Sequence, residues 1–81
     1  MAVLLVEDEP NVVSVIKRGL AEYGFELSVA TDGLTGLQMA IDYPFDLIIL
    51  DAMMPGQSGY EFAADLRRHS DVPILLSLIH I

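Results

Sequence analysis

The hydrophobic residues of this chain gather in short runs that alternate with longer segments of helical periodicity. The runs at residues 2–6 and 47–50 contain only apolar side chains. Such short runs without a polar face are typical of strands buried on both faces of a parallel sheet. Residues 26–30 alternate weakly and predict a strand nearer the sheet edge, and residues 72–76 predict a fourth strand.

The first helix is predicted to begin at Pro10, because proline suits the first helical turn, and to end before Gly24. Its apolar residues are expected to share one helical face: Val12, Val13, Ile16, Leu20 and Tyr23.

Two further helices follow. The second is expected after the turn and cap at residues 31–33 and before Tyr43-Pro44, with its apolar residues again at helical spacing. Those residues are Leu34, Leu37, Ala40 and Ile41. The third helix is marked by a capping box from Ser58 to Glu61, followed by a buried face of Phe62, Ala63 and Leu66.

This alternation of strands and helices predicts an α/β fold with a parallel sheet and right-handed crossovers. The chain has 81 residues, which is enough for a single domain only. If the first and third strands are neighbours, the strand order is 2-1-3-4, and their carboxyl ends meet at one edge of the sheet.

Composition narrows the classes of function. The net charge of −8 argues against a nucleic-acid or anionic-membrane surface on this segment. The absence of cysteine excludes thiolate metal sites and disulfides. No run approaches the roughly 20 apolar residues of a membrane span, and the first residues lack the features of a signal peptide, so a cytoplasmic protein is expected.

The candidate chemistry is acidic. Glu7 and Asp8 follow the first strand, and Asp51 ends the third. Two carboxylates about 4 Å apart repel by roughly 4 kcal/mol at an effective dielectric near 20, so three require a cation, shifted pKa values or both. Oxygen ligands without cysteine or a nearby histidine favour a hard cation, above all Mg²⁺. A carboxylate beside such an ion can act as a nucleophile and form an acyl phosphate.

Taken singly, each acid also has a structural interpretation. Asp8 or Glu9 alone can cap the first helix, and Asp51 alone can bond loop amides. Asp32 is expected to be a cap, Glu9 to supply charge at a helix start, and Asp46 to lie at the opposite end of the sheet. The combination of Glu7-Asp8, Asp51 and the following loop at Pro55-Gly56 is much harder to explain by structural roles alone.

At these residues the chain resembles the receiver domain of bacterial two-component response regulators. The resemblance is carried by residues 3–10, 30–33, 46–51 and 54–59, and it extends to about residue 76. It predicts that residues 1–81 form a single, partial receiver domain. It implies a flavodoxin-like fold and a phosphorelay with a sensor histidine kinase. In the full-length protein it also suggests a C-terminal DNA-binding effector domain.

The resemblance also implies roles for individual residues. Asp51 matches the phospho-acceptor, Asp8 the direct ligand of Mg²⁺ (or Mn²⁺), and Glu7 the second acid, which often acts through water. The backbone carbonyl of Met53 matches a third protein ligand. The residues that match the shape of the following loop are Pro55, Gly56 and Gly59. A receiver takes part in its own phosphotransfer but is not a stand-alone enzyme.

The chain departs from the family after its fourth strand. A whole receiver has five β-α units, and residues 77–81 form an atypical tail. The family's switch hydroxyl falls at Leu78, so Ser77 is a candidate only with a one-residue offset, which reverses the face of a strand. An incomplete receiver is expected to switch poorly and to be marginally stable, with residues 72–79 as an open edge.

Three alternatives stay open at this point. The chain can be a receiver-like interaction module that is not phosphorylated, or a non-functional truncated fragment. A haloacid-dehalogenase-like phosphatase also uses a strand-end aspartate, but its general-acid aspartate would fall at Met53. The absence of a glycine-rich fingerprint after the first strand argues against a dinucleotide-binding enzyme.

Overall fold

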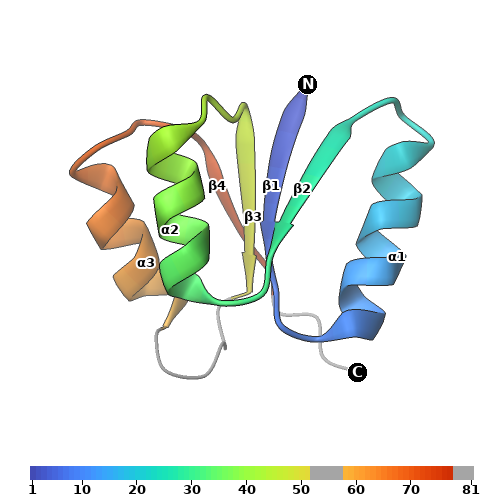
Figure 1. Cartoon of the computed structure of the whole chain (residues 1–81), viewed down its shortest axis with the longest axis horizontal. Coiled ribbons are helices and arrows are strands. Elements are labelled where there is room, and N and C mark those ends of the chain that lie inside the picture. Colours follow the sequence, from blue (N-terminus) through green and yellow to red (C-terminus); the bar gives the residue numbers. More distant parts are fainter. Residues whose placement is uncertain (52–57, 78–81) are drawn as a thin grey trace.

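The computed structural model describes residues 1–51 and 58–77, except for the side chain of Ser77. Strands and helices alternate along the chain, as the sequence predicts (Figure 1). Their bounds are β1 Ala2–Val6, α1 Pro10–Ala21, β2 Glu26–Ala30, α2 Gly33–Asp42, β3 Leu47–Asp51, α3 Gly59–Arg67 and β4 Ile74–Ser77.

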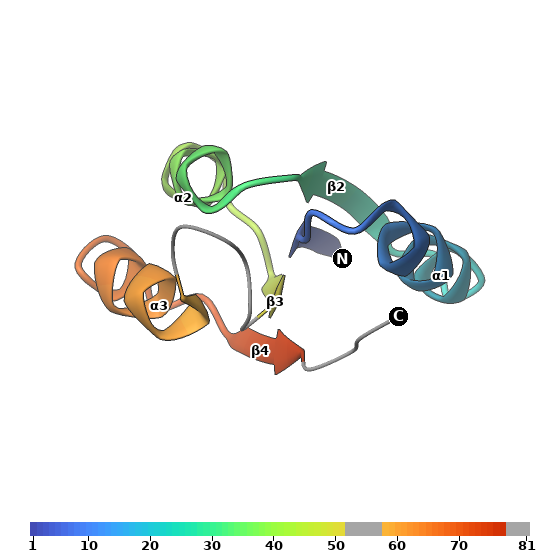
Figure 2. The same cartoon turned by 90° about the horizontal axis from the view of Figure 1, so that it is seen from below.

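The strands form one parallel sheet in the order β2-β1-β3-β4, which confirms the predicted topology. In its register Val6 lies opposite Leu50, and Asp51 lies opposite Ser77. Helix α1 covers one face of the sheet, whereas α2 and α3 cover the other (Figures 1 and 2). No helix within the described ranges has the length and apolar character needed to cross a membrane.

The alternation of side chains along the strands divides the core into two parts of unequal size. The face toward α2 and α3 is closed by Phe62 and Leu66, both fully buried, and its strand residues include Leu4 and Leu50. The cluster toward α1 is built on three buried strand residues, Val3, Leu5 and Ile49, with half-buried residues of α1 packed against them. The sheet is therefore more completely covered on the α2–α3 side.

Leu75 of β4 lies where the described helices leave the α1 side of the sheet uncovered. It pairs with Ile49 in the parallel ladder, so the two side chains leave the sheet on the same face. Ile49 is 8% exposed, but Leu75 is 55% exposed. In the described part of the chain, β4 is also an edge strand, as the sequence predicts for this segment.

The predicted apolar face of α2 is right for two of its four residues. Ala40 is buried and Leu37 packs half-buried against the core, whereas Leu34 and Ile41 are exposed and the helix also buries Gly33 and Gly36. A Cβ atom added at Gly36 would lie 2.7 Å from Cγ2 of Val6. The helix thus approaches β1 so closely that Gly36 is required at the nearest contact, and Leu37 and Met39 pack beside it.

The end of α1 also differs from the prediction. The helix ends at Ala21, and Tyr23 lies beyond it with most of its side chain exposed. Gly24 completes the turn with φ of 77°, a conformation that glycine adopts without steric cost. Tyr23 therefore does not belong to the buried face that Val12 begins.

Candidate functional site

The three predicted acids converge at the carboxyl edge of the sheet. Each of Glu7, Asp8 and Asp51 offers a carboxylate oxygen within 4.8 Å of those of the other two. The register explains this convergence, because Glu7 follows Val6 and Asp51 follows Leu50, and those two residues are neighbours on adjacent strands. The main geometric prediction from the sequence is therefore met.

The three acids differ strongly in their exposure. Glu7 is 2% exposed and Asp51 is 8% exposed, whereas Asp8 faces solvent. The chain holds Glu7 in place through its own backbone, since Oε2 accepts hydrogen bonds from the N–H groups of Asp8 at 2.9 Å and Glu9 at 3.3 Å. The site thus consists of one buried acid, one at the strand end and one at the surface.

Burial changes the protonation of this cluster. Burial, together with a side-chain hydrogen bond to Asp51 and the charge of that group, raises the pKa of Glu7 from 4.5 to about 7. The N–H of Glu9 acts in the opposite direction but does not offset these causes. At neutral pH the buried carboxyl group therefore holds a proton in a large fraction of molecules.

The donor set fits a hard divalent cation. All of its side-chain donors are carboxylate oxygens, and the sequence has no cysteine that would favour a softer metal. A buried acid with a raised pKa beside a second acid is also an environment that a positive charge would stabilise. The residues present are thus compatible with Mg²⁺ or Mn²⁺ at this edge of the sheet.

The other predicted site residues have different outcomes. Met53, Pro55 and Gly56 lie outside the described residues. Gly59 is the buried first residue of α3, directly after the Ser58 cap. Ser77 pairs with Asp51 in the β3–β4 ladder, but its side chain is also outside the described part, so a switch role stays a prediction.

The acids that were expected to be structural have structural roles. The Glu9 side chain caps α1 by accepting from the N–H of Asn11. Asp32 caps α2 through hydrogen bonds from the Thr35 N–H at 2.8 Å and hydroxyl at 2.9 Å. Asp46, at the far edge of the sheet, accepts from the N–H of Ala2. These residues do not join the three-acid site.

The fold agrees with comparisons with known proteins. The model of the response regulator receiver domain family matches residues 3–80. The chain belongs to this family. This chain, called the receiver chain below, is 44% identical over 75 residues to the transcriptional activator protein IrlR of Burkholderia pseudomallei. The match covers 93% of the receiver chain and 33% of IrlR. It is 40% identical over 77 residues to the transcriptional regulatory protein CusR of Escherichia coli, covering 94% of the chain and 34% of CusR.

Solved structures show the same receiver fold. The response regulator TrrA, crystallised in complex with the histidine kinase ThkA, is similar to the receiver chain with a TM-score of 0.87 and 38% identity; the match covers 98% of this chain and 71% of that one. The receiver domain of sensor histidine kinase PA1611 from Pseudomonas aeruginosa is similar with a TM-score of 0.87 and 29% identity. That match covers 93% of the receiver chain and 64% of the PA1611 chain. That structure has a magnesium ion coordinated in its active site cleft.

The receiver chain spans about a third of the length of the curated relatives that it matches. The comparisons therefore show the family and the flavodoxin-like fold for the 81 residues of the receiver chain, and not for the rest of such a protein.

Proposed function

We propose that Asp51 accepts a phosphoryl group from a phosphohistidine of a sensor histidine kinase, in a reaction that depends on Mg²⁺ (or Mn²⁺). The single observation that carries this proposal is the convergence of three carboxylates at the carboxyl ends of β1 and β3. This edge is where open α/β sheets bind their ligands. Membership of the receiver family supports the same assignment.

Among the three acids, Asp51 is best suited to act as the nucleophile. The carboxylate of Glu7 accepts two backbone hydrogen bonds, and its raised pKa leaves it partly protonated at neutral pH. Asp8 is exposed, so water competes for its oxygens. Asp51 ends a buried strand, which fixes its position, and its carboxylate lies at the sheet edge beside those of Glu7 and Asp8.

The reaction proceeds by in-line attack of a carboxylate oxygen of Asp51 on phosphorus. The bond between phosphorus and the imidazole nitrogen breaks, the nitrogen keeps the electron pair, and an acyl phosphate forms on Asp51. The carboxylates of Glu7, Asp8 and Asp51, with the backbone carbonyl of Met53, would hold the cation. A bound divalent cation supplies positive charge that offsets the repulsion between the carboxylate and the phosphoryl oxygens.

The relatives suggest what lies on either side of this step. TrrA is described in complex with a histidine kinase, and IrlR and CusR are described as transcriptional regulators. We infer that a sensor histidine kinase is the donor. We also infer that the whole protein carries a C-terminal DNA-binding effector domain and acts in the cytoplasm.

The test uses the chain with Mg²⁺ and acetyl phosphate, followed by intact-mass measurement. We expect the mass to rise by one phosphoryl group, and we expect Asp51→Asn or addition of EDTA to abolish the increase. Asp71→Asn is the matched control, because it removes one carboxylate at an exposed position before β4 and should leave the increase intact. If the unaltered chain gains no mass, the interaction module that is not phosphorylated becomes the better description.

A further inference from the structure

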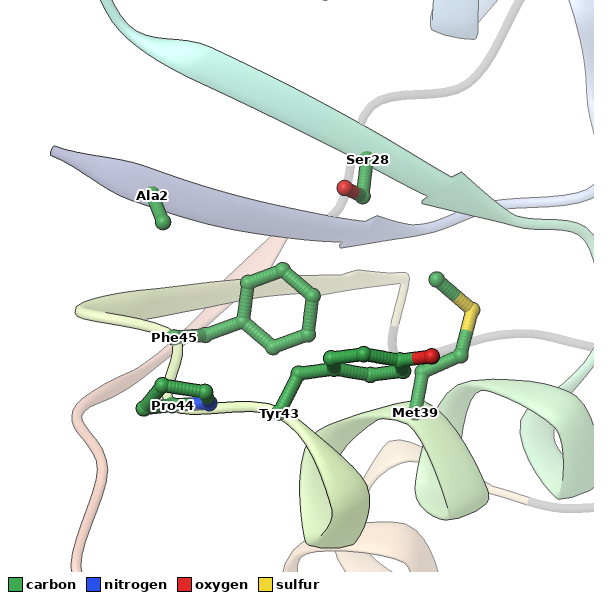
Figure 3. A pocket seen from close by; sticks show the side chains of 6 residues that line it. All are labelled: Ala2, Ser28, Met39, Tyr43, Pro44 and Phe45. Atoms are coloured by element: carbon green, nitrogen blue, oxygen red, sulfur yellow. The ribbon is translucent and has the colours of Figure 1, made fainter.

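A second site lies at the opposite edge of the sheet from the three acids. A pocket of about 400 Å³ opens where β1 begins and α2 ends (Figure 3). Its lining residues are Ala2, Ser28, Met39, Tyr43, Pro44 and Phe45. Its volume is within the range of small-molecule sites. It lies toward the start of β1, where it contacts Ala2, whereas Glu7 follows the end of that strand.

The aromatic wall of the pocket is held by local backbone structure. Tyr43 caps α2, and its N–H donates to the carbonyl oxygen of Met39 at 3.0 Å. Pro44 follows, and the N–H of Phe45 donates to the carbonyl oxygen of Tyr43 at 3.0 Å, so the segment forms a tight turn. The rings of Tyr43 and Phe45 lie edge to face, with centroids 6.5 Å apart.

The strand side of the pocket is equally fixed. The N–H of Ala2 donates to Oδ2 of Asp46 at 2.8 Å, and the N–H of Asp46 donates back to the carbonyl oxygen of Ala2 at 2.8 Å. The N–H of Glu26 donates to the carbonyl oxygen of Met1, which joins β2 to the same end of β1. A pocket whose walls are already held in place binds a ligand with little loss of conformational entropy.

The lining defines the class of ligand. Two aromatic rings, a thioether and a proline ring offer surfaces for a flat apolar group. Figure 3 shows Ser28 projecting from β2 toward the pocket, across from Tyr43 and Met39, so its hydroxyl group is available as a polar contact.

The charged side chains beside the pocket are acidic, and they outnumber one positive group, the α-amino group of Met1 next to Ala2. The six lining residues carry no charge, but Asp42 and Asp46 flank the aromatic turn in the sequence. Glu26 is exposed and lies two residues before Ser28, so both side chains leave β2 on the same face. The four basic residues belong to α1 and to the end of α3. This arrangement favours a cationic ligand over an anionic one.

We propose that this pocket binds a small planar aromatic amine. The ring lies against Tyr43, Phe45 and Met39, and the ammonium group faces the acidic rim, where cation–π attraction from the Tyr43 ring adds to the charge attraction. The site shares no residue with the three-acid cluster, so it binds its ligand whether or not Asp51 is phosphorylated.

Three probes with one ring system and different charges test this proposal: tryptamine, indole and indole-3-acetate. In an NMR titration of the ¹⁵N-labelled chain, we expect tryptamine to shift the amide signals of Ser28, Met39 and Phe45. We expect indole to bind more weakly and indole-3-acetate to have a Kd roughly fivefold or more above that of tryptamine, as a few partly exposed charges allow. Equal affinity for all three probes, or shifts elsewhere on the molecule, would overturn the proposal.

Variants separate the pocket from non-specific binding. Ser28→Leu fills the pocket and should abolish tryptamine binding, and Tyr43→Ala removes an exposed ring and should weaken it severalfold. Glu26→Gln should weaken tryptamine binding but not indole binding, whereas Asp71→Asn, with the same change in charge, should alter neither. Asp51→Asn should also leave binding unchanged, which keeps this test independent of phosphorylation. Undiminished tryptamine binding by folded Tyr43→Ala and Glu26→Gln variants would refute the assignment.

Discussion

The substitution Glu7→Gln measures the free energy that the buried acid of the site contributes. Glutamine has nearly the same shape as a protonated glutamate, and its amide group can donate to Asp51 in place of the carboxyl proton. The substitution therefore retains the packing of a side chain that is 2% exposed while removing its ability to ionise. In an unaltered chain without a bound cation, ionisation of Glu7 opposes folding.

The magnitude follows from the pKa. The pKa of Glu7 is 4.5 as an ordinary group and about 7 in the folded chain, because of burial and the neighbouring Asp51. The folded state therefore binds more protons than the unfolded state between these values, and stability falls as pH rises through that window. Ionisation of Glu7 therefore lowers the free energy of unfolding by about 3 kcal/mol above pH 7, and by only about 1 kcal/mol at pH 5.

Urea unfolding followed by circular dichroism, in EDTA, gives the comparison. We expect Glu7→Gln to raise the free energy of unfolding by about 3 kcal/mol at pH 8 and by about 1 kcal/mol at pH 5. Glu22→Gln removes the same charge from an exposed position and should change stability by less than about 0.5 kcal/mol at both pH values. A gain for Glu7→Gln that is equal at the two pH values, or a loss that grows with pH, would refute the reasoning.

Three further predictions follow from the same structure. At the proposed site a bound Mg²⁺ would displace the proton of Glu7, so its apparent Kd in calorimetry should rise as pH falls below about 7, by up to about tenfold per pH unit, and should be constant above pH 8; a Kd independent of pH contradicts this. Gly36→Ala should destabilise the chain by about 1–3 kcal/mol in urea unfolding, because its Cβ overlaps the fully buried Val6. Gly19→Ala, in a helix with open space around it, should instead stabilise by about 0.5–1 kcal/mol, and equal effects would show that Gly36 is not closely packed. Leu75 is an exposed apolar residue on the edge strand β4, where a second copy of the chain is expected to pair. Leu75→Lys should therefore reduce self-association in analytical ultracentrifugation without lowering the melting temperature, and unchanged association would refute this role of β4.

The strands and the acid cluster were predictable because their signals are local and strong. The apolar run of β1 and the capping box from Ser58 to Glu61 each specify structure within a few residues, and the structure has both. The convergence of Glu7 with Asp51 needed only the strand order in addition. The sequence also predicted a cation, shifted pKa values or both, but only burial in the folded chain shows that Glu7 carries a shift.

The face of α2 was not predictable in the same way. Hydrophobic periodicity favours Leu34 and Ile41, which are exposed, as strongly as Leu37 and Ala40, which pack against the core, and it gives no signal for the buried Gly36. The choice depends on how closely α2 approaches Val6, and that distance is a tertiary property. The pocket beside Tyr43 was missed for the same reason, because the sequence marks Tyr43-Pro44 only as the end of a helix.

The unequal cover of the two sheet faces has a consequence for hydrogen exchange. Only one residue of α1, Val12, is fully buried, whereas α2 and α3 are each anchored by three. Amides of α1 are therefore expected to open by local unfolding before those of the other two helices. Because Asp8 lies in the link between β1 and α1, each such opening would release the surface acid from the cluster while the strand ends that carry Glu7 and Asp51 stay paired.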